Sequence, residues 1–165
     1  FRSGFPESVL DSLQPTCMLL SPGPGNPKDF GLSKTIAIGL KRKIPMVGVC
    51  LGLQGLVEYY GGELGVLPYP MHGKPSTVSV HEPRGHLFAG LPATFQVGRY
   101  HSLYSIKGKH PKELRITATT ADGVVMGIEH ASLPIAAVQF HPESIMTNTD
   151  VGLQMLSNAI TRLRY

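Results

Sequence analysis

The sequence of 165 residues has no tryptophan, only two cysteines and few charged residues. Two cysteines, Cys17 and Cys50, are too few for the disulfide framework of a small secreted domain. No apolar run approaches the ~18 residues that a membrane-spanning helix needs. The absence of both features favours a globular protein of the reducing cytoplasm, without a membrane partner.

Charge and histidine are also sparse in the patterns that would carry other functions. Charged residues make up 16% of the chain, the net charge is +4, and residues 41–43 form the one basic run. A nucleic-acid site would need a sustained basic stripe with interleaved aromatic residues, so we expect none. The seven histidines lack the H-E-x-x-H or Cys/His spacing of a metal site, so we expect no metal.

The length and the 42% hydrophobic content fit one globular domain over residues 1–165. In the first sixty residues, segments typical of strands alternate with segments typical of helices, which indicates a parallel sheet. We therefore expect an α/β fold with three layers: a mostly parallel central sheet flanked by helices, and a smaller antiparallel sheet.

The expected elements follow from apolar spacing and from Gly/Pro punctuation. Within residues 1–16 we expect a loop and a short helix, with Val9, Leu10 and Leu13 on one face. Longer helices are expected at 29–43, with Leu32, Ile36 and Leu40 inward, and from 149 or 150 to 163, with Leu153, Leu156 and Ile160 buried. We expect strands at 17–20, 44–49, 77–81, 94–98, 114–119, 124–129 and 135–140, the pair at 77–98 being short and antiparallel in a proline-rich region.

Residues 44–60 organise the chain. An apolar, β-branched half is followed by a half with helical spacing, and Cys50 lies between them, flanked by Gly48 and Gly52. This G-x-C-x-G pattern is the thiol counterpart of the strand-to-helix elbow that exposes a nucleophile. Unpaired N–H groups at the helix start would favour the thiolate. The alternative is that Cys50 is a structural cysteine of the core.

A second segment supplies a base. Residues 135–140 are expected to be a strand, and His141 and Glu143 follow it on either side of Pro142. In an extended segment, side chains two apart point the same way, so the carboxylate can orient the imidazole. The alternative is a pair that serves only packing.

A third segment is the loop at residues 21–27, S-P-G-P-G-N-P, which follows the apolar residues 17–20. A loop rich in glycine and proline is rigid and presents backbone N–H groups, as an oxyanion hole requires. Its alternative is an ordinary turn. Together, the three segments indicate a cysteine nucleophile with its base and oxyanion hole.

The sequence resembles the class I (triad) glutamine amidotransferases, and within them the glutaminase subunits or domains of anthranilate synthase. Five ordered motifs carry this resemblance: S-P-G-P-G-N-P, G-V-C-L-G-L-Q-G, M-H-G-K, R-Y-H-S-L and Q-F-H-P-E-S, between residues 21 and 144. The resemblance implies hydrolysis of L-glutamine and transfer of ammonia to a chorismate-using synthase, present as a subunit or a fused domain. It implies no cofactor in this domain, and Mg²⁺ in the synthase partner.

The resemblance also implies roles for individual residues. Cys50 would be the nucleophile, His141 the base and Glu143 its orienting carboxylate. Backbone and side chains at Gly23, Pro24, Gly25, Leu51, Gln54, Ser102 and Leu103 would form the oxyanion hole and bind glutamine. His72, Gly73 and Lys74 would form a polar turn beside the synthase.

Two alternatives remain at this point. A sister glutaminase that supplies 4-amino-4-deoxychorismate synthesis shares nearly every motif, and a non-catalytic regulatory subunit would bind a synthase without hydrolysing glutamine. Carbamoyl-phosphate and GMP synthesis fit the motifs less well. Comparison with the family pattern also suggests an N-terminally incomplete domain, without the first core strand.

Overall fold

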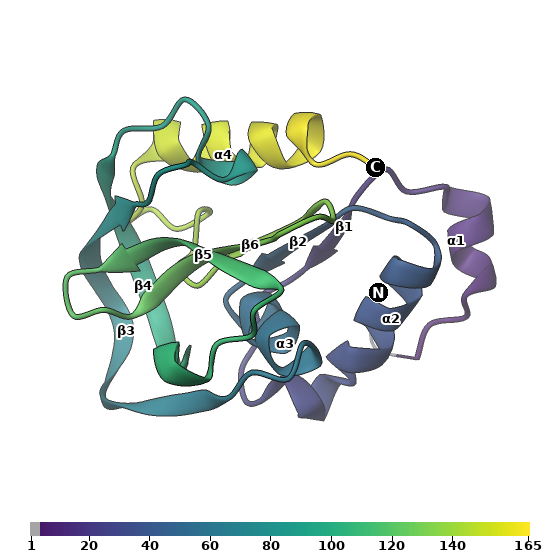
Figure 1. The fold of residues 1–165 in the computed structure, drawn as a ribbon, viewed down its shortest axis with the longest axis horizontal. Coiled ribbons are helices and arrows are strands. Elements are labelled where there is room, and N and C mark those ends of the chain that lie inside the picture. The colour runs from purple at the N-terminus through teal and green to yellow at the C-terminus, as the bar shows by residue number, and fades with distance from the viewer. Residues whose placement is uncertain (1–3) are drawn as a thin grey trace.

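One seven-stranded sheet runs through residues 4–165, the part of the chain that the computed structural model describes (Figure 1). Its strand order is β1-β2-β7-β6-β5-β3-β4. The strands are β1 Met18–Leu20, β2 Met46–Val49, β3 Leu64–Val80, β4 Thr94–Ser105, β5 Leu114–Thr120, β6 Val125–His130 and β7 Ile135–Val138. The α-helices are α1 Ser8–Leu13, α2 Leu32–Lys41, α3 Leu51–Tyr59 and α4 Thr149–Arg162, with short 3-10 helices at Pro27–Phe30, His86–Phe88 and Lys107–Lys109.

The sheet has a parallel and an antiparallel part. β1, β2 and β7 are parallel, with Val47 aligned with Leu19 on one side and with Ala136 on the other. The pairs β7–β6, β6–β5, β5–β3 and β3–β4 are antiparallel. The predicted α/β class is confirmed, but the sheet is mixed and not mostly parallel, since four of its six strand pairs are antiparallel. The antiparallel strands continue the parallel ones in one sheet and do not form a separate small sheet.

Helices cover the sheet on both sides, which gives the three predicted layers (Figure 1). On one face α2 and α3 bury a core that includes Ile36, Leu53 and Leu56. On the other face α4 and the 3-10 helix His86–Phe88 bury a second core with Phe88 and Met155. Both faces of the parallel strands are therefore apolar, in agreement with the uninterrupted apolar sequence of β2.

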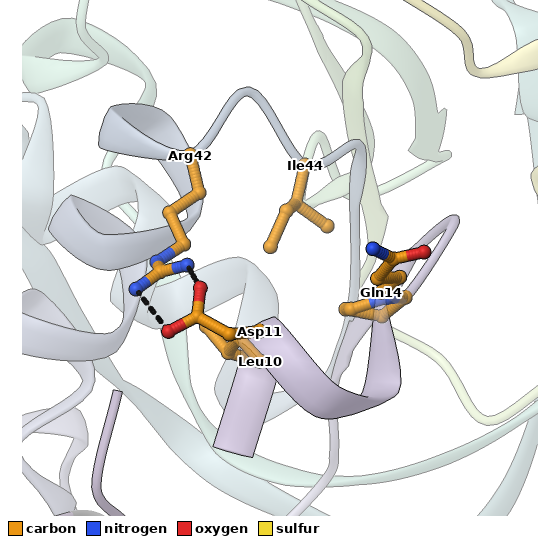
Figure 2. Close-up of a pocket in the computed structure, with 6 residues that line it drawn as sticks. Leu10, Asp11, Gln14, Arg42 and Ile44 are labelled. Atoms are coloured by element: carbon orange, nitrogen blue, oxygen red, sulfur yellow. Dashed lines mark hydrogen bonds and ion pairs between the residues drawn. The ribbon is translucent and has the colours of Figure 1, made fainter. Parts of the chain in front are cut away.

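Helix α1 lies along α2 at the outer side of the molecule (Figure 1). Leu10 is buried as predicted, but Leu13 is 55% exposed, so the predicted apolar face is only partly right. Figure 2 shows Asp11 of α1 facing the guanidinium of Arg42, which follows α2, beside Ile44. Hydrogen bonding to Arg42 lowers the pKa of Asp11. Part of the basic run at 41–43 thus holds α1 in place.

The proline-rich region at 63–104 departs from its prediction. Instead of two short strands, the 17-residue β3 pairs with the 12-residue β4, with register shifts between Val66 and Met71 and between His72 and Lys74. β5 pairs with β3 only at Val78–Val80. Pro68 and Pro70 lie in the register shift between Val66 and Met71, and Pro75 lies where one side of β3 has no partner strand. Irregular and edge positions of this kind are where strands tolerate proline.

Helix α4 buries a different face from the predicted one. Leu153, Leu156 and Ile160 are exposed, whereas Val151, Met155 and Ala159 are buried. Its cap also differs: the Asn148 side chain accepts hydrogen bonds from the N–H groups of Asp150 and Val151. The helix itself, which ends one residue before the predicted Leu163, is confirmed.

Candidate active site

Cys50 occupies a strained elbow between β2 and α3. It is the N-cap of α3, with φ 51° and ψ −99°, a conformation that L-residues rarely adopt. Its N–H donates to the Val138 carbonyl at 2.8 Å, so the end of β2 is tied to the end of β7. Backbone strain of this kind is typical of functional positions and is held by the surrounding packing.

The two flanking glycines have separate structural reasons. A Cβ at Gly52 would lie 2.2 Å from the Leu20 carbonyl oxygen, since α3 begins directly against the end of β1. A Cβ at Gly48 would lie 2.8 Å from the Gly52 carbonyl carbon and 2.9 Å from the Ala137 Cβ. The pattern around Cys50 therefore allows close approach of α3 to two strands.

His141 and Glu143 form the predicted pair. His141 Nδ1 lies 2.6 Å from Glu143 Oε1, and because a carboxylate accepts, Nδ1 carries the proton. His141 Nε2 is then an acceptor, and it is buried without a hydrogen-bond partner among residues 4–165. The local geometry was predicted wrongly: the Ser144 N–H donates to the His141 carbonyl at 3.1 Å, so residues 141–144 form a turn and not an extended segment.

The His141 backbone is fixed to β4. Its N–H donates to the Gly98 carbonyl at 3.1 Å, and its carbonyl accepts from the Thr147 hydroxyl at 2.6 Å. The Tyr100 ring meets the imidazole edge-on, with centroids 5.0 Å apart. The His141 imidazole is thus held by strand β4 as well as by the segment after β7.

A cavity of about 320 Å³ opens at Cys50. Its lining comes from three distant segments: the glycine/proline loop, the elbow with α3, and the paired strands β3 and β4. The lining residues are Gly23, Pro24, Gly25, Cys50, Gln54, His72, Tyr100, His101, Ser102 and Leu103. Six of the seven residues predicted for the oxyanion hole and glutamine binding therefore line the same cavity as Cys50.

The other predicted residues lie around this cavity. Leu51 lines a neighbouring cavity on the other side of the glycine/proline loop, and its Cδ2 approaches Gly23. His72 lines the cavity from β3, but Gly73 and Lys74 do not. Residues 71–74 were predicted as a turn; they are part of β3, with a bulge at which Gly73 has φ 62°. Bulges are common beside active sites because they re-aim a side chain.

The resting thiol is protonated, contrary to the expectation from the helix start. Burial raises the pKa of Cys50 to about 11, and the charge of Glu143 contributes to the rise, against smaller lowering effects of the Leu51 N–H and the Gln139 side chain. Desolvation thus outweighs the helix N-terminus. The thiolate has to form by proton transfer to a base. Burial likewise raises the pKa of Cys17, a half-buried residue packed against the core.

Sequence reasoning missed three residues at this site. Tyr100 and His101 line the cavity, and Gln139 lies behind it, fully buried and within hydrogen-bond distance of Gln54. Tyr100 and His101 belong to the R-Y-H-S-L motif, and Gln139 opens Q-F-H-P-E-S. Their positions within these motifs indicated that they lie near the site. The motifs did not indicate where each side chain points.

Metal-binding clusters and membrane-spanning helices are both absent from the described part of the chain. No group of three or more His, Cys, Asp or Glu side chains among residues 4–165 could hold a metal ion. No helix within those residues is long and apolar enough to cross a membrane.

Comparison with known sequences gives a consistent result. The family model of class-I glutamine amidotransferases matches residues 4–162. An Azospirillum brasilense protein named anthranilate synthase is 50% identical over 163 residues, 98% of this chain and 22% of that protein. A Methanocaldococcus jannaschii protein named anthranilate synthase component 2 is 43% identical over 158 residues, 92% of this chain and 77% of that protein. The chain thus spans under a quarter of the first relative and most of the second.

Solved structures agree with the fold. A Thermoplasma acidophilum protein, provisionally described as a GMP synthase subunit, superposes with a TM-score of 0.80 and 27% identity over 94% of this chain and 75% of that chain. A Thermotoga maritima glutamine amidotransferase has a TM-score of 0.66 and 17% identity over 86% of this chain and 61% of that chain, and supports the fold alone. The chain therefore belongs to the class-I glutamine amidotransferase family.

Proposed function

We propose that this chain is the glutamine amidotransferase component of an anthranilate synthase, which hydrolyses glutamine and passes ammonia to a chorismate-using synthase. The observation that carries the proposal is the cavity in which the elbow cysteine, Gln54 and the segment Ser102–Leu103 meet. The anthranilate synthase names of relatives that match nearly the whole chain support the choice of acceptor.

The first chemical step is proton transfer coupled to attack. The buried His141 Nε2 accepts the Cys50 proton, and the sulfur bonds to the amide carbon of glutamine. Glu143 stabilises the imidazolium through Nδ1, at 2.6 Å. The N–H groups of Leu51 and Gly23 serve the oxyanion, because both lie next to Cys50 or line its cavity.

The second stage releases nitrogen and regenerates the thiol. The imidazolium returns its proton to the amide nitrogen, which leaves as ammonia, and a thioester remains on Cys50. Water attacks that thioester with His141 as base, and glutamate departs as the sulfur recovers a proton. Ammonia released into water at neutral pH would mostly become unreactive ammonium, so the acceptor site has to lie close to this cavity.

The face beside the cavity suits a docked synthase. Three large apolar side chains are strongly exposed there: Val66 at 70%, Tyr69 at 78% and Ile145 at 99%. Val66 and Tyr69 belong to β3, and Ile145 follows Ser144, whose hydroxyl lies 3.0 Å from the Tyr100 hydroxyl. Exposed apolar residues around a site are typical of a protein interface. We propose that the synthase covers this face, with His72, Gly73 and Lys74 at its centre.

We expect that replacing His72 and Lys74 with alanine weakens activation of glutamine hydrolysis by chorismate. His72 aligns with Tyr100 and Lys74 with Arg99, so β3 links the proposed interface to the cavity-lining strand β4. Coupled sites typically affect each other by roughly 5–150-fold. In the variant, the ratio of the glutaminase rate with chorismate to the rate without it should fall toward one. The measurement is the glutaminase rate with and without chorismate in the complete enzyme.

The matched control for this variant is Lys112→Ala. Lys112 is exposed and adjoins Pro111, which packs near the C-terminal end of α3, the end remote from Cys50. An activation ratio equal to that of the parent in the double variant would remove β3 from the coupling and leave His72 with a role only in the cavity.

The proposed function itself is tested by identifying the product. The protein that carries this chain is combined with its synthase, glutamine and chorismate, and the product is identified by its mass and fluorescence. Anthranilate supports the proposal. A 4-amino-4-deoxychorismate product would reassign the acceptor, and the absence of glutamate formation would make the chain a regulatory component.

A further inference from the structure

A row of buried polar side chains extends from the wall of the cavity to Cys50. Arg99, His101, Gln54 and Gln139 are between 0% and 3% exposed. Buried polar groups are costly unless they are hydrogen-bonded, and here they are bonded mainly to one another. Two groups fix the directions of these hydrogen bonds: the Arg99 guanidinium, which can only donate, and the Leu103 carbonyl, which can only accept.

The first fixed direction is at Arg99. A guanidinium only donates, and Arg99 Nε lies 3.1 Å from His101 Nε2, so this ring nitrogen accepts. The imidazole proton is therefore on Nδ1, which donates to the Leu103 carbonyl at 2.8 Å. Burial lowers the pKa of His101 to about 4, with the charge of Arg99 contributing, so the ring is neutral at pH 7. Arg99 also reaches Ser76, at 3.4 Å, and Asp122, at 3.8 Å.

The second fixed direction is at Leu103. Its carbonyl only accepts, and Gln54 lies 3.2 Å away, so the Gln54 atom that faces it is the nitrogen. The same nitrogen lies 3.3 Å from the nearest atom of the Gln139 side-chain amide, which must therefore be the oxygen. The amide orientation of Gln139 follows, and its N–H₂ group points away from Gln54.

What the Gln139 nitrogen faces is the end of β2. The Val138 carbonyl accepts the Cys50 N–H at 2.8 Å, and Gln139 follows Val138 in the chain. Gln139 and Cys50 are therefore neighbours across the sheet. The nitrogen is buried and makes no hydrogen bond of regular geometry within residues 4–165. The Gln139 side chain nevertheless lies near enough to lower the pKa of the Cys50 thiol. It is a donor without a full partner while the sulfur is neutral.

We propose that Gln139 is a further catalytic residue, whose amide nitrogen donates a hydrogen bond to the Cys50 sulfur when it carries negative charge. The inference rests on the proposed role of Cys50. Gln54, Leu103, His101 and Arg99 are positioning residues that fix the orientation of this amide. The thiol proton still passes to His141, and no bond to Gln139 forms or breaks. A donor that becomes satisfied only when charge develops stabilises the reacting state more than the resting state.

The test is the rate of Cys50 alkylation by iodoacetamide at a fixed pH of about 8, measured by peptide mass spectrometry in the complete enzyme. Gln139→Met keeps the side-chain length and removes the donor. We expect the alkylation rate to fall by about 10–100-fold, since the loss of a hydrogen bond to the charged sulfur lowers the fraction of thiolate. We also expect kcat for glutamine hydrolysis to fall by about 10–100-fold, with a smaller change in KM.

Two comparisons keep the result unambiguous. Gln96→Met makes the same change at an exposed position of β4 and should leave the alkylation rate at the parent value. Alkylation needs no glutamine, so it tests Gln139 separately from the proposed function. If the parent is an active glutaminase and the Gln139 variant is alkylated at the parent rate, this inference alone is overturned. A parent without glutaminase activity would instead overturn the proposed function.

If Gln139→Met fails to fold, two His101 variants test the same row. Asparagine can place a donor where Nδ1 stands and so keep the hydrogen bond to Leu103, whereas glutamine reaches the Nε2 position and loses it. We expect His101→Gln to raise KM for glutamine and to lower the alkylation rate of Cys50 more than His101→Asn does. Equal effects of the two variants, or the opposite order, would contradict the fixed directions and with them the role of Gln139.

Discussion

Replacement of Cys50 with alanine is expected to abolish glutamine-dependent anthranilate formation and to leave ammonia-dependent formation close to the parent rate. In the proposed mechanism the thiol serves only to release ammonia, and free ammonia would bypass it. Loss of a covalent nucleophile should lower the glutamine-dependent rate by at least about 10³-fold. The small volume change at a residue that is 5% exposed should leave the fold intact. Both rates are measured in the complete enzyme.

Cys17 provides the matched control for this variant. It is the other free cysteine in the chain, it packs against the core, and it lines none of the cavity at Cys50. Cys17→Ala should keep both activities, and a glutamine-derived diazo-ketone should label Cys50 alone. Labelling of Cys17, or loss of both activities from a folded Cys50 variant, would contradict the proposed nucleophile.

The elbow could be predicted from the sequence because its requirements are local. Gly48, Cys50 and Gly52 lie within five residues. Gly52 is needed where α3 approaches β1, and Gly48 where β2 approaches α3 and β7. The protonation state of Cys50 could not be predicted in the same way. It depends on how deeply the thiol is buried, and burial is set by strands far away in the sequence.

The wrong face predicted for α4 shows the limit of apolar spacing. Leu153, Leu156 and Ile160 have helical spacing, but so do Val151, Met155 and Ala159, and spacing alone cannot choose between two apolar faces.

Two contacts that are not apolar fix the rotation of α4. A Cβ at Gly152 would lie 2.3 Å from the Pro142 carbonyl, so only a glycine can face that turn. The Asn158 side chain donates to the carbonyls of Leu87 and Ala89 at 3.0 and 2.8 Å. These long-range contacts carry no signal in a single sequence.

Gln54 was the only member of the buried polar row that the sequence predicted, and Arg99, His101 and Gln139 escaped prediction for a related reason. Arg99 and His101 alternate with exposed Tyr100 on β4, a pattern that reads as a polar strand end. Their burial comes from the bulged pairing with β3, which the prolines of that segment argued against. The motifs therefore located the site, but not the side chains that support it from behind.

The Gly52→Ala substitution is expected to have the second largest effect, because it disturbs the elbow without touching the reacting groups. The new Cβ would lie 2.2 Å from the Leu20 carbonyl oxygen and 2.9 Å from the Leu20 Cβ. A backbone carbonyl at the end of β1 cannot rotate away, so the start of α3 has to move. A displacement of about 1 Å at a catalytic group can cost on the order of 10²-fold in rate. Overpacking should also lower the free energy of unfolding by about 1–3 kcal/mol.

Gly55→Ala tests whether the position or the residue type causes that loss. Gly55 lies one turn further along α3, and its added Cβ would meet the Leu32 side chain, with Cδ1 at 2.7 Å and Cβ at 3.2 Å. The Cδ1 end can rotate, and the Cβ contact needs only a small shift of Leu32. Because alanine also favours a helix over glycine by about 1 kcal/mol, we expect near-parental activity and stability. The measurements are glutamine-dependent kcat/KM and denaturant unfolding of both variants. If the two variants lost activity equally, the close contact between Gly52 and β1 would not be what holds Cys50 in its reactive position.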